Sequence, residues 1–151
     1  MTPRHAVTLC FSKYIDMRGR APRSEYWNWV LFLLASNLLI GWLDGVTRIG
    51  LLQGVFTLGT LSPTIAVTVR RLHDTDRTGW WVFLLLGPIV AALGTLVILM
   101  IGSVLIDVIF ALMLMTPMCV LLYFLIKPGT SDENRFGPEP WNAEGHRPAS
   151  S

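Results

Sequence analysis

Long apolar stretches alternate with short polar ones along most of this chain. Four apolar runs occupy residues 26–43, 49–69, 80–101 and 104–126. Each run contains 18 to 23 residues, close to the roughly 20 residues that a helix needs to cross the hydrocarbon core of a bilayer. Four such runs with almost no charge on any face do not suit the helices of a soluble bundle. The pattern therefore predicts an all-α integral membrane protein with four transmembrane helices.

The ends of these runs carry turn and capping residues. The last two runs are nearly continuous, and a single helix over residues 80–126 would be about 70 Å long, far longer than a bilayer is thick. We therefore expect a turn at Gly102 and Ser103. At the start of the first span, Ser24 is expected to act as the N-cap, and Glu25 then lies where the helix dipole favours an acidic side chain.

A short amphipathic helix is predicted ahead of the first span. Thr2 and Pro3 suit an N-cap and a first helical position. Apolar residues then recur with helical spacing at Val7, Cys10, Phe11, Tyr14 and Ile15. This helix is expected either to lie on the inner leaflet or to pack against the polar end of its own chain.

Basic residues are concentrated on one side of the predicted spans. Eleven of the twelve lysines and arginines precede the first span, lie between the second and third, or follow the fourth, and only Arg48 falls elsewhere. Because lysine and arginine are enriched in cytoplasmic loops, both termini and the middle loop are predicted to be cytoplasmic. Residues 1–140 are expected to form one membrane domain, and residues 141–151 a disordered tail.

Composition narrows the class of protein further. Hydrophobic residues make up 52% of the chain and charged residues 15%, with a net charge of only +2. The surface of a soluble protein needs a larger share of charged residues than this. The small net charge also gives no indication of nucleic-acid binding. Cys10 and Cys119 are predicted to lie on the cytoplasmic side and inside the fourth span, so no disulfide is expected.

Three polar stretches together resemble a known family. They are MRGRAPRSEYW at 17–27, RRLHD at 70–74 followed by TGWW at 78–81, and GTSDENRFGPEP at 129–140. In this order around four spans they resemble the signatures of domain-of-unknown-function family 805, small bacterial inner-membrane proteins, over roughly residues 11–140. The resemblance implies a multi-pass protein of the bacterial inner membrane and supplies no biochemical role. Asp76 stands where the family more often has a small residue.

The predicted topology brings the three motifs to one membrane face as a polar collar. Its basic residues are all arginine, whose guanidinium group makes bidentate bonds to carboxylates and phosphates that lysine cannot make. Internal salt bridges, topology anchoring and ligand binding all remain open. Tryptophans beside the collar suit the headgroup boundary or a cation–π contact, and Phe136 should fold the C-terminal motif back onto it. The candidate binding residues are Arg18, Arg20, Arg23, Glu25, Arg70, Arg71, His73, Asp74, Arg77, Trp80, Trp81, Asn134 and Arg135.

Three functions are compatible with this pattern. The favoured one is a non-enzymatic membrane protein whose collar binds anionic lipid headgroups or a protein partner. The alternative is a small transporter or channel, assembled as a homo-oligomer around the threonine stripe Thr57, Thr60, Thr64 and Thr68. An enzyme that acts on a lipid phosphate at His73 and Asp74 is third, because the other histidines lack ligand-like spacing for a metal. No catalytic residue, metal or cofactor is assigned.

Overall fold

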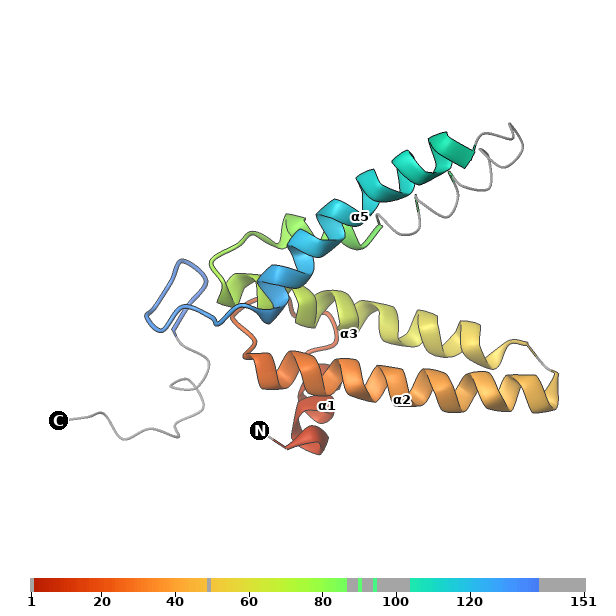
Figure 1. Cartoon of the computed structure of the whole chain (residues 1–151). Helices are drawn as coiled ribbons and strands as arrows, with labels where there is room; N and C mark the ends of the chain where they lie inside the picture. The colour runs from red at the N-terminus through yellow and green to blue at the C-terminus, as the bar shows by residue number, and fades with distance from the viewer. Residues whose placement is uncertain (1, 49, 87–89, 91–93, 95–103, 139–151) are drawn as a thin grey trace.

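The computed structural model describes residues 2–48, 50–86, 90, 94 and 104–138. Within them the chain forms four α-helices and one 3-10 helix (Figure 1). In chain order these are α1 (Pro3–Ser12), α2 (Arg23–Thr47), α3 (Leu52–Asp74), η1 (Gly79–Leu86) and α5 (Val104–Ile126). The described part is thus all-helical, apart from a single bridge between Asn134 and Gly137.

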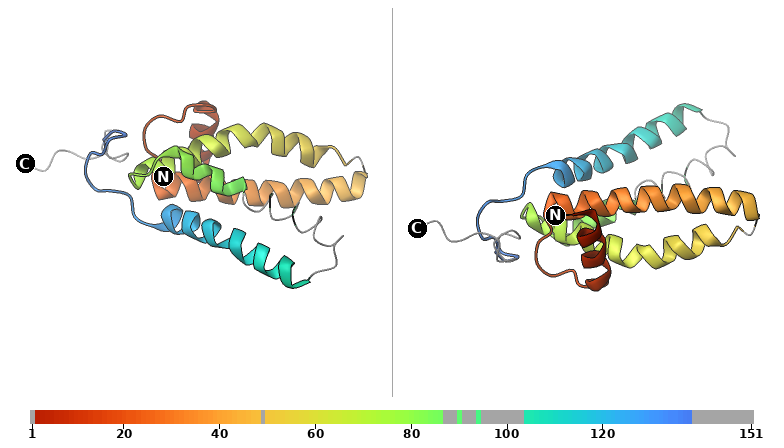
Figure 2. Two further views of the ribbon diagram at one scale, coloured as in Figure 1. Left: turned by 90° about the horizontal axis from the view of Figure 1, so that it is seen from above. Right: turned by 90° about the horizontal axis from the view of Figure 1, so that it is seen from below.

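Helices α2 and α3 form an antiparallel pair that runs the length of the molecule (Figures 1 and 2). Both are long and apolar enough to cross a membrane, and the end of α5 adds a shorter apolar stretch, Met115–Ile126. The predicted third span, 80–101, lies mostly outside the described residues, and its first part is the 3-10 helix η1. The predicted turn at Gly102 and Ser103 and the predicted tail also lie outside them.

The helices begin and end at different residues from those predicted. The N-cap of α2 is Pro22, not Ser24, because the Pro22 carbonyl accepts the N–H groups of Glu25 at 3.1 Å and Tyr26 at 3.3 Å. Ser24 therefore lies inside the helix. Helix α3 continues to Asp74 instead of stopping at Val69, so the polar segment that was expected to be a loop begins as the last turns of a helix.

Helix α1 begins where it was predicted. The Thr2 hydroxyl accepts the N–H of His5 at 3.4 Å, and Pro3 is the first helical residue. The helix lies across α2 and α3 and buries Ala6 and Cys10 (Figure 2). Of the two predicted placements, α1 thus adopts packing on its own chain. Apolar side chains on and after it remain exposed, namely Phe11, Tyr14, Ile15 and Met17.

The segment after α1 is bound to the middle of α3. The Tyr14 hydroxyl donates to the carbonyl of Gly59 at 2.6 Å, and the Ser62 hydroxyl donates to the carbonyl of Tyr14 at 3.1 Å. Trp29 is fully buried beside α1, and Phe11 meets its ring edge-on at a centroid distance of 5.2 Å. Trp29 belongs to the core, where its Nε1 donates to the Thr64 hydroxyl at 3.1 Å.

Candidate functional site at the arginine end

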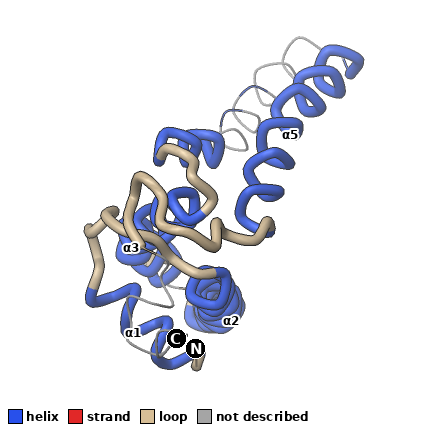
Figure 3. The backbone as a smooth tube through the Cα atoms, turned by 90° about the vertical axis from the view of Figure 1, so that its left-hand side faces the viewer, coloured by secondary structure: helices blue, strands red, loops and turns tan. Residues whose placement is uncertain are grey.

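The candidate site lies at the end of the bundle where α2 begins and α3 and α5 end. Segments 16–22 and 127–138 complete this region, which we call the arginine end. Figure 3 faces it, with the connecting segments in front of the helices. The thirteen predicted site residues belong to these segments, to the adjoining helix turns, to the link 75–78 or to the 3-10 helix η1 that follows it. The predicted residues therefore lie at one end of the bundle, although their environments differ.

Asp74 is the central carboxylate of the arginine end. Its side chain is only 6% exposed, and its Oδ1 accepts Arg20 Nε at 3.0 Å and lies 2.9 Å from Arg20 Nη2. Its Oδ2 accepts Nη1 of Arg71, one helical turn earlier in α3. Both guanidinium groups are buried. A buried charge is tolerated only when it is paired and hydrogen-bonded, so the carboxylate and the two arginines depend on one another.

The same two arginines also bind backbone carbonyls from the end of α5 and beyond. Arg71 Nε donates to the carbonyl of Leu125 at 3.1 Å, and its Nη2 donates to that of Lys127. Arg20 donates to the carbonyl of Asp132 at 2.8 Å, and to those of Thr130 and Gly137. Since the last carbonyls of a helix have no partner within it, the arginines supply the donors that the end of α5 lacks.

A second buried ion pair joins α2 to α3. Arg70 Nη1 lies 2.6 Å from Glu25 Oε1, and the two side chains are 0% and 2% exposed. The Cys10 thiol of α1 contacts the same carboxylate oxygen at 4.0 Å. Burial, and next the Glu25 charge, raise the pKa of Cys10 from 9.0 to about 12, so this thiol stays protonated near neutral pH. In the described part of the chain, Arg70 Nε and Nη2 have no hydrogen-bond partner.

The C-terminal motif folds back onto the end of α3, as predicted. The Thr130 N–H donates to the carbonyl of Asp74 at 2.9 Å, and the Asn134 amide donates to that of His73 at 2.9 Å. Phe136 stacks on the His73 ring with centroids 3.8 Å apart. Gly129 lies so close to Asp74 that any Cβ atom there would overlap the carboxylate. Gly129 and Thr130 thus position the site, although neither was singled out from the sequence.

The remaining arginines of the collar are exposed. Arg18, Arg23 and Arg77 all face outward, and Arg135 forms a half-exposed ion pair with Asp76 at 3.0 Å. Arg77 lies over the rings of Phe124 at 4.7 Å and Trp81 at 5.9 Å, which confirms the predicted cation–π contact with a collar tryptophan.

Trp80 has 76% of its surface exposed and stacks on Phe83 with centroids 5.3 Å apart. An exposed indole of this kind suits the boundary between apolar lipid and headgroups.

The arginine end thus has two layers with different chemistry. Inside, Arg20 and Arg71 are occupied by carboxylates and carbonyls, and Arg70 binds the Glu25 carboxylate through Nη1. Outside, the exposed arginines are available to solvent or headgroups. His73 and Asp74, considered as a reactive pair, make separate contacts: His73 Nδ1 lies 3.2 Å from the carbonyl of Gly19, while Asp74 binds arginines. Across the described ranges, no three His, Cys, Asp or Glu side chains gather as metal ligands would.

Comparison with known proteins agrees with the family resemblance. The model of the family "Protein of unknown function (DUF805)" matches residues 14–138. The inner membrane proteins YhaH and YhaI of Escherichia coli K12 are 35% and 32% identical over 133 residues, which is 84% of this chain and 88% and 87% of theirs. The uncharacterized protein YiiR of the same strain is 38% identical over 72 residues, 47% of this chain and 49% of its own. No solved structure matches significantly. The chain therefore belongs to the DUF805 family of bacterial inner-membrane proteins.

Proposed function

We propose that the chain is a four-span inner-membrane protein with both termini in the cytoplasm, and that its arginine end binds anionic lipid headgroups without catalysing a reaction. The observation that carries this proposal is the division of the collar into two layers. Buried charges are committed to the fold, whereas Arg18, Arg23 and Arg77 are exposed and form none of the ion pairs described for this chain. The surface layer therefore offers exposed guanidinium groups that the anionic headgroups of the membrane can bind.

The arrangement of the helices supports this orientation. Helix α2 begins, and α3 and α5 end, at the arginine end (Figures 1 and 3), and cytoplasmic sides of membrane proteins carry the excess of arginine and lysine. Away from that end α2 presents an apolar surface, because Leu31, Leu34 and Leu38 are each more than half exposed. Such a surface suits contact with lipid chains, and the exposed arginines would then lie at headgroup depth.

The side chains around the exposed arginines favour a lipid over a soluble protein as the ligand. The exposed Trp80 and the apolar side chains Ile15 and Met17 lie in or near the same polar segments. Tryptophan next to arginine is typical of the membrane boundary, and each basic side chain near an anionic leaflet contributes about 1 kcal/mol of attraction.

The transporter alternative lacks such support. The hydroxyls of Thr60, Thr64 and Thr68 each donate to the carbonyl four residues earlier in α3. Thr64 also accepts the Trp29 indole N–H. This part of the threonine stripe is thus used within α3 and against α2.

Native mass spectrometry with phosphatidylglycerol and phosphatidylcholine tests the proposal. The wild-type protein should retain phosphatidylglycerol in preference. The triple variant Arg18→Gln, Arg23→Gln and Arg77→Gln should bind it about 100-fold more weakly, because three contributions of about 1 kcal/mol are lost. The control is Arg48→Gln, an exposed arginine at the opposite end of α2, which should bind normally.

Two results would contradict the proposal. One is a wild-type protein with no preference between the two lipids. The other is a folded triple variant, with an unchanged thermal transition, that retains as many phosphatidylglycerol molecules as the wild-type protein. Substitution of Arg70 and Arg71 is unsuitable here, since both are buried in ion pairs and their loss would unfold the arginine end before any ligand was tested.

A further inference from the structure

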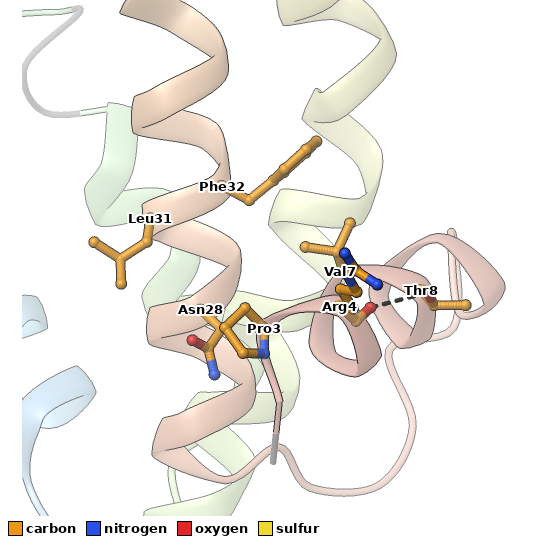
Figure 4. Close-up of a pocket in the computed structure, with 7 residues that line it drawn as sticks. All are labelled: Pro3, Arg4, Val7, Thr8, Asn28, Leu31 and Phe32. Carbon is orange, nitrogen blue, oxygen red and sulfur yellow. Dashed lines mark hydrogen bonds between the residues drawn. The ribbon is translucent and has the colours of Figure 1, made fainter.

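A groove lies between α1 and the first half of α2, outside the arginine end. Its volume is about 630 Å³, within the range of roughly 300–1,000 Å³ that is usual for ligand sites. Figure 4 shows α1 crossing beside α2, with Pro3 next to Asn28 and with Leu31 and Phe32 further along α2. The lining residues are Pro3, Arg4, Val7, Thr8, Asn28, Leu31 and Phe32.

The polar part of this groove suits an anion. Arg4 is exposed, and in the described part of the chain it forms no ion pair. Helix α1 contains no acidic residue that would compete for its guanidinium group. The Thr8 hydroxyl is occupied, because it donates to the carbonyl of Arg4 at 2.9 Å. The Asn28 amide nitrogen donates to the carbonyl of Ser24 at 2.7 Å, which leaves the amide oxygen to accept a hydroxyl hydrogen.

The remainder of the groove is apolar and continues along α2. Leu31 is 60% exposed, and Leu34, Leu38 and Trp42 follow it at helical spacing with 57%, 69% and 64% of their surfaces exposed. At 1.5 Å per residue this stripe extends about 16 Å from Leu31 to Trp42. An arginine at one end of a long apolar stripe is complementary to a molecule with one anionic end and a hydrocarbon chain.

We propose that this groove binds one anionic phospholipid, with its phosphate on Arg4 and one acyl chain along the α2 stripe. Asn28 accepts a hydrogen bond from the headgroup where the headgroup carries a hydroxyl, as phosphatidylglycerol does. This inference rests on the proposed function and goes beyond it, because it assigns a defined site on another part of the molecule and a count of one lipid.

Two variants and two matched controls test the site by native mass spectrometry. Arg4→Gln removes the charge, and Thr8→Trp fills the groove with an indole. Arg48→Gln removes an exposed arginine elsewhere, and Ser12→Trp places the same indole at an exposed α1 position that does not line the groove. Wild type and controls should retain one tightly held phosphatidylglycerol. Arg4→Gln should bind that lipid at least tenfold more weakly, and Thr8→Trp should lose it.

The outcomes separate this inference from the proposed function. If the triple arginine variant loses phosphatidylglycerol while Arg4→Gln and Thr8→Trp retain it, the groove inference is overturned and the proposed function stands. If wild type does not distinguish phosphatidylglycerol from phosphatidylcholine, both are overturned. A wild-type dimer that Thr8→Trp converts to monomer, without any change in bound lipid, would overturn the lipid in favour of a second copy of the chain.

Discussion

The two ends of the α2–α3 pair are stabilised by different kinds of contact. At the arginine end, buried ion pairs connect segments that are far apart in the sequence, such as Arg20 with Asp74 and Glu25 with Arg70. At the opposite end, which we call the hairpin end, the contacts are local. The Asp44 carboxylate accepts the N–H groups of Leu52 at 3.3 Å and Gln53 at 2.8 Å, and Gln53 donates to Asn37.

This difference follows from the number of segments that each end connects. The hairpin end connects two consecutive helices, so one capping carboxylate is enough to fix the turn. The arginine end brings together the segment before α2, the ends of α3 and α5, and segment 127–138. Arginine suits this task because its five donors bind carboxylates and carbonyls from several directions at once. Substitutions at the arginine end should therefore cost more than those at the hairpin end.

The largest effect is expected for Asp74→Ala. Removing this carboxylate leaves Arg20 and Arg71 buried without their acidic partner, and breaking a buried ion pair in this way costs about 3–5 kcal/mol. The control is Asp76→Asn, because asparagine tolerates the positive φ of this residue. It removes only the half-exposed pair with Arg135, which contributes about 0–1 kcal/mol. Thermal unfolding in detergent, followed by circular dichroism, measures both. Equal transition temperatures for the two variants would show that the buried network does not stabilise the arginine end.

A smaller loss is expected for Gly129→Ala. The added methyl group would overlap the Asp74 carboxylate, so the loop or the ion pair must shift, and overpacking of this kind costs about 1–3 kcal/mol. Gly54→Ala, where no atom lies within 4 Å of the new methyl group, should be neutral or slightly stabilising, because alanine favours a helix over glycine. Limited proteolysis of segment 127–138 adds a local readout. Cleavage there should accelerate in Gly129→Ala alone, and unchanged cleavage would contradict the proposed close contact.

The smallest effect is expected at the hairpin end. Asp44→Ala removes a capping acceptor for two N–H groups at the start of α3, which costs about 1 kcal/mol. Hydrogen exchange should rise at Leu52 and Gln53 and remain unchanged at Thr130, whose N–H binds the Asp74 carbonyl. If Asp44→Ala destabilised the protein as much as Asp74→Ala, the contrast between the two ends would be wrong.

Hydrophobic periodicity and capping signals predicted much of the fold. They placed α1 through Thr2 and Pro3, and they located most of α2, α3 and α5. The folding of the C-terminal motif back onto the end of α3 was also predictable, because Phe136 and Arg135 can contact residues there. Four spans and cytoplasmic termini stay predictions.

The sequence could not show which charges are buried. Dense polarity at residues 70–74 looked like a loop, yet these residues end α3 because their charges are paired inside the bundle. One signal was present: Asp74 follows Arg71 by three residues and Arg70 by four, the spacings at which side chains of one helix are neighbours. The carbonyls that bind Arg20 and Arg71 left no such signal, since a backbone acceptor is the same for every residue type.

The separation in sequence between Arg20 and its backbone partners determines when these contacts can form during synthesis. Its guanidinium group binds carbonyls at residues 130, 132 and 137, more than a hundred positions later in the chain. The ribosome must therefore make and release segment 127–138 before the charges near the start can be satisfied. Contacts of such long sequence separation form late and slowly. Until segment 127–138 is made, a nascent chain that has already formed α2 and α3 carries incompletely paired arginines at the arginine end. These arginines distinguish an unfinished molecule from a finished one.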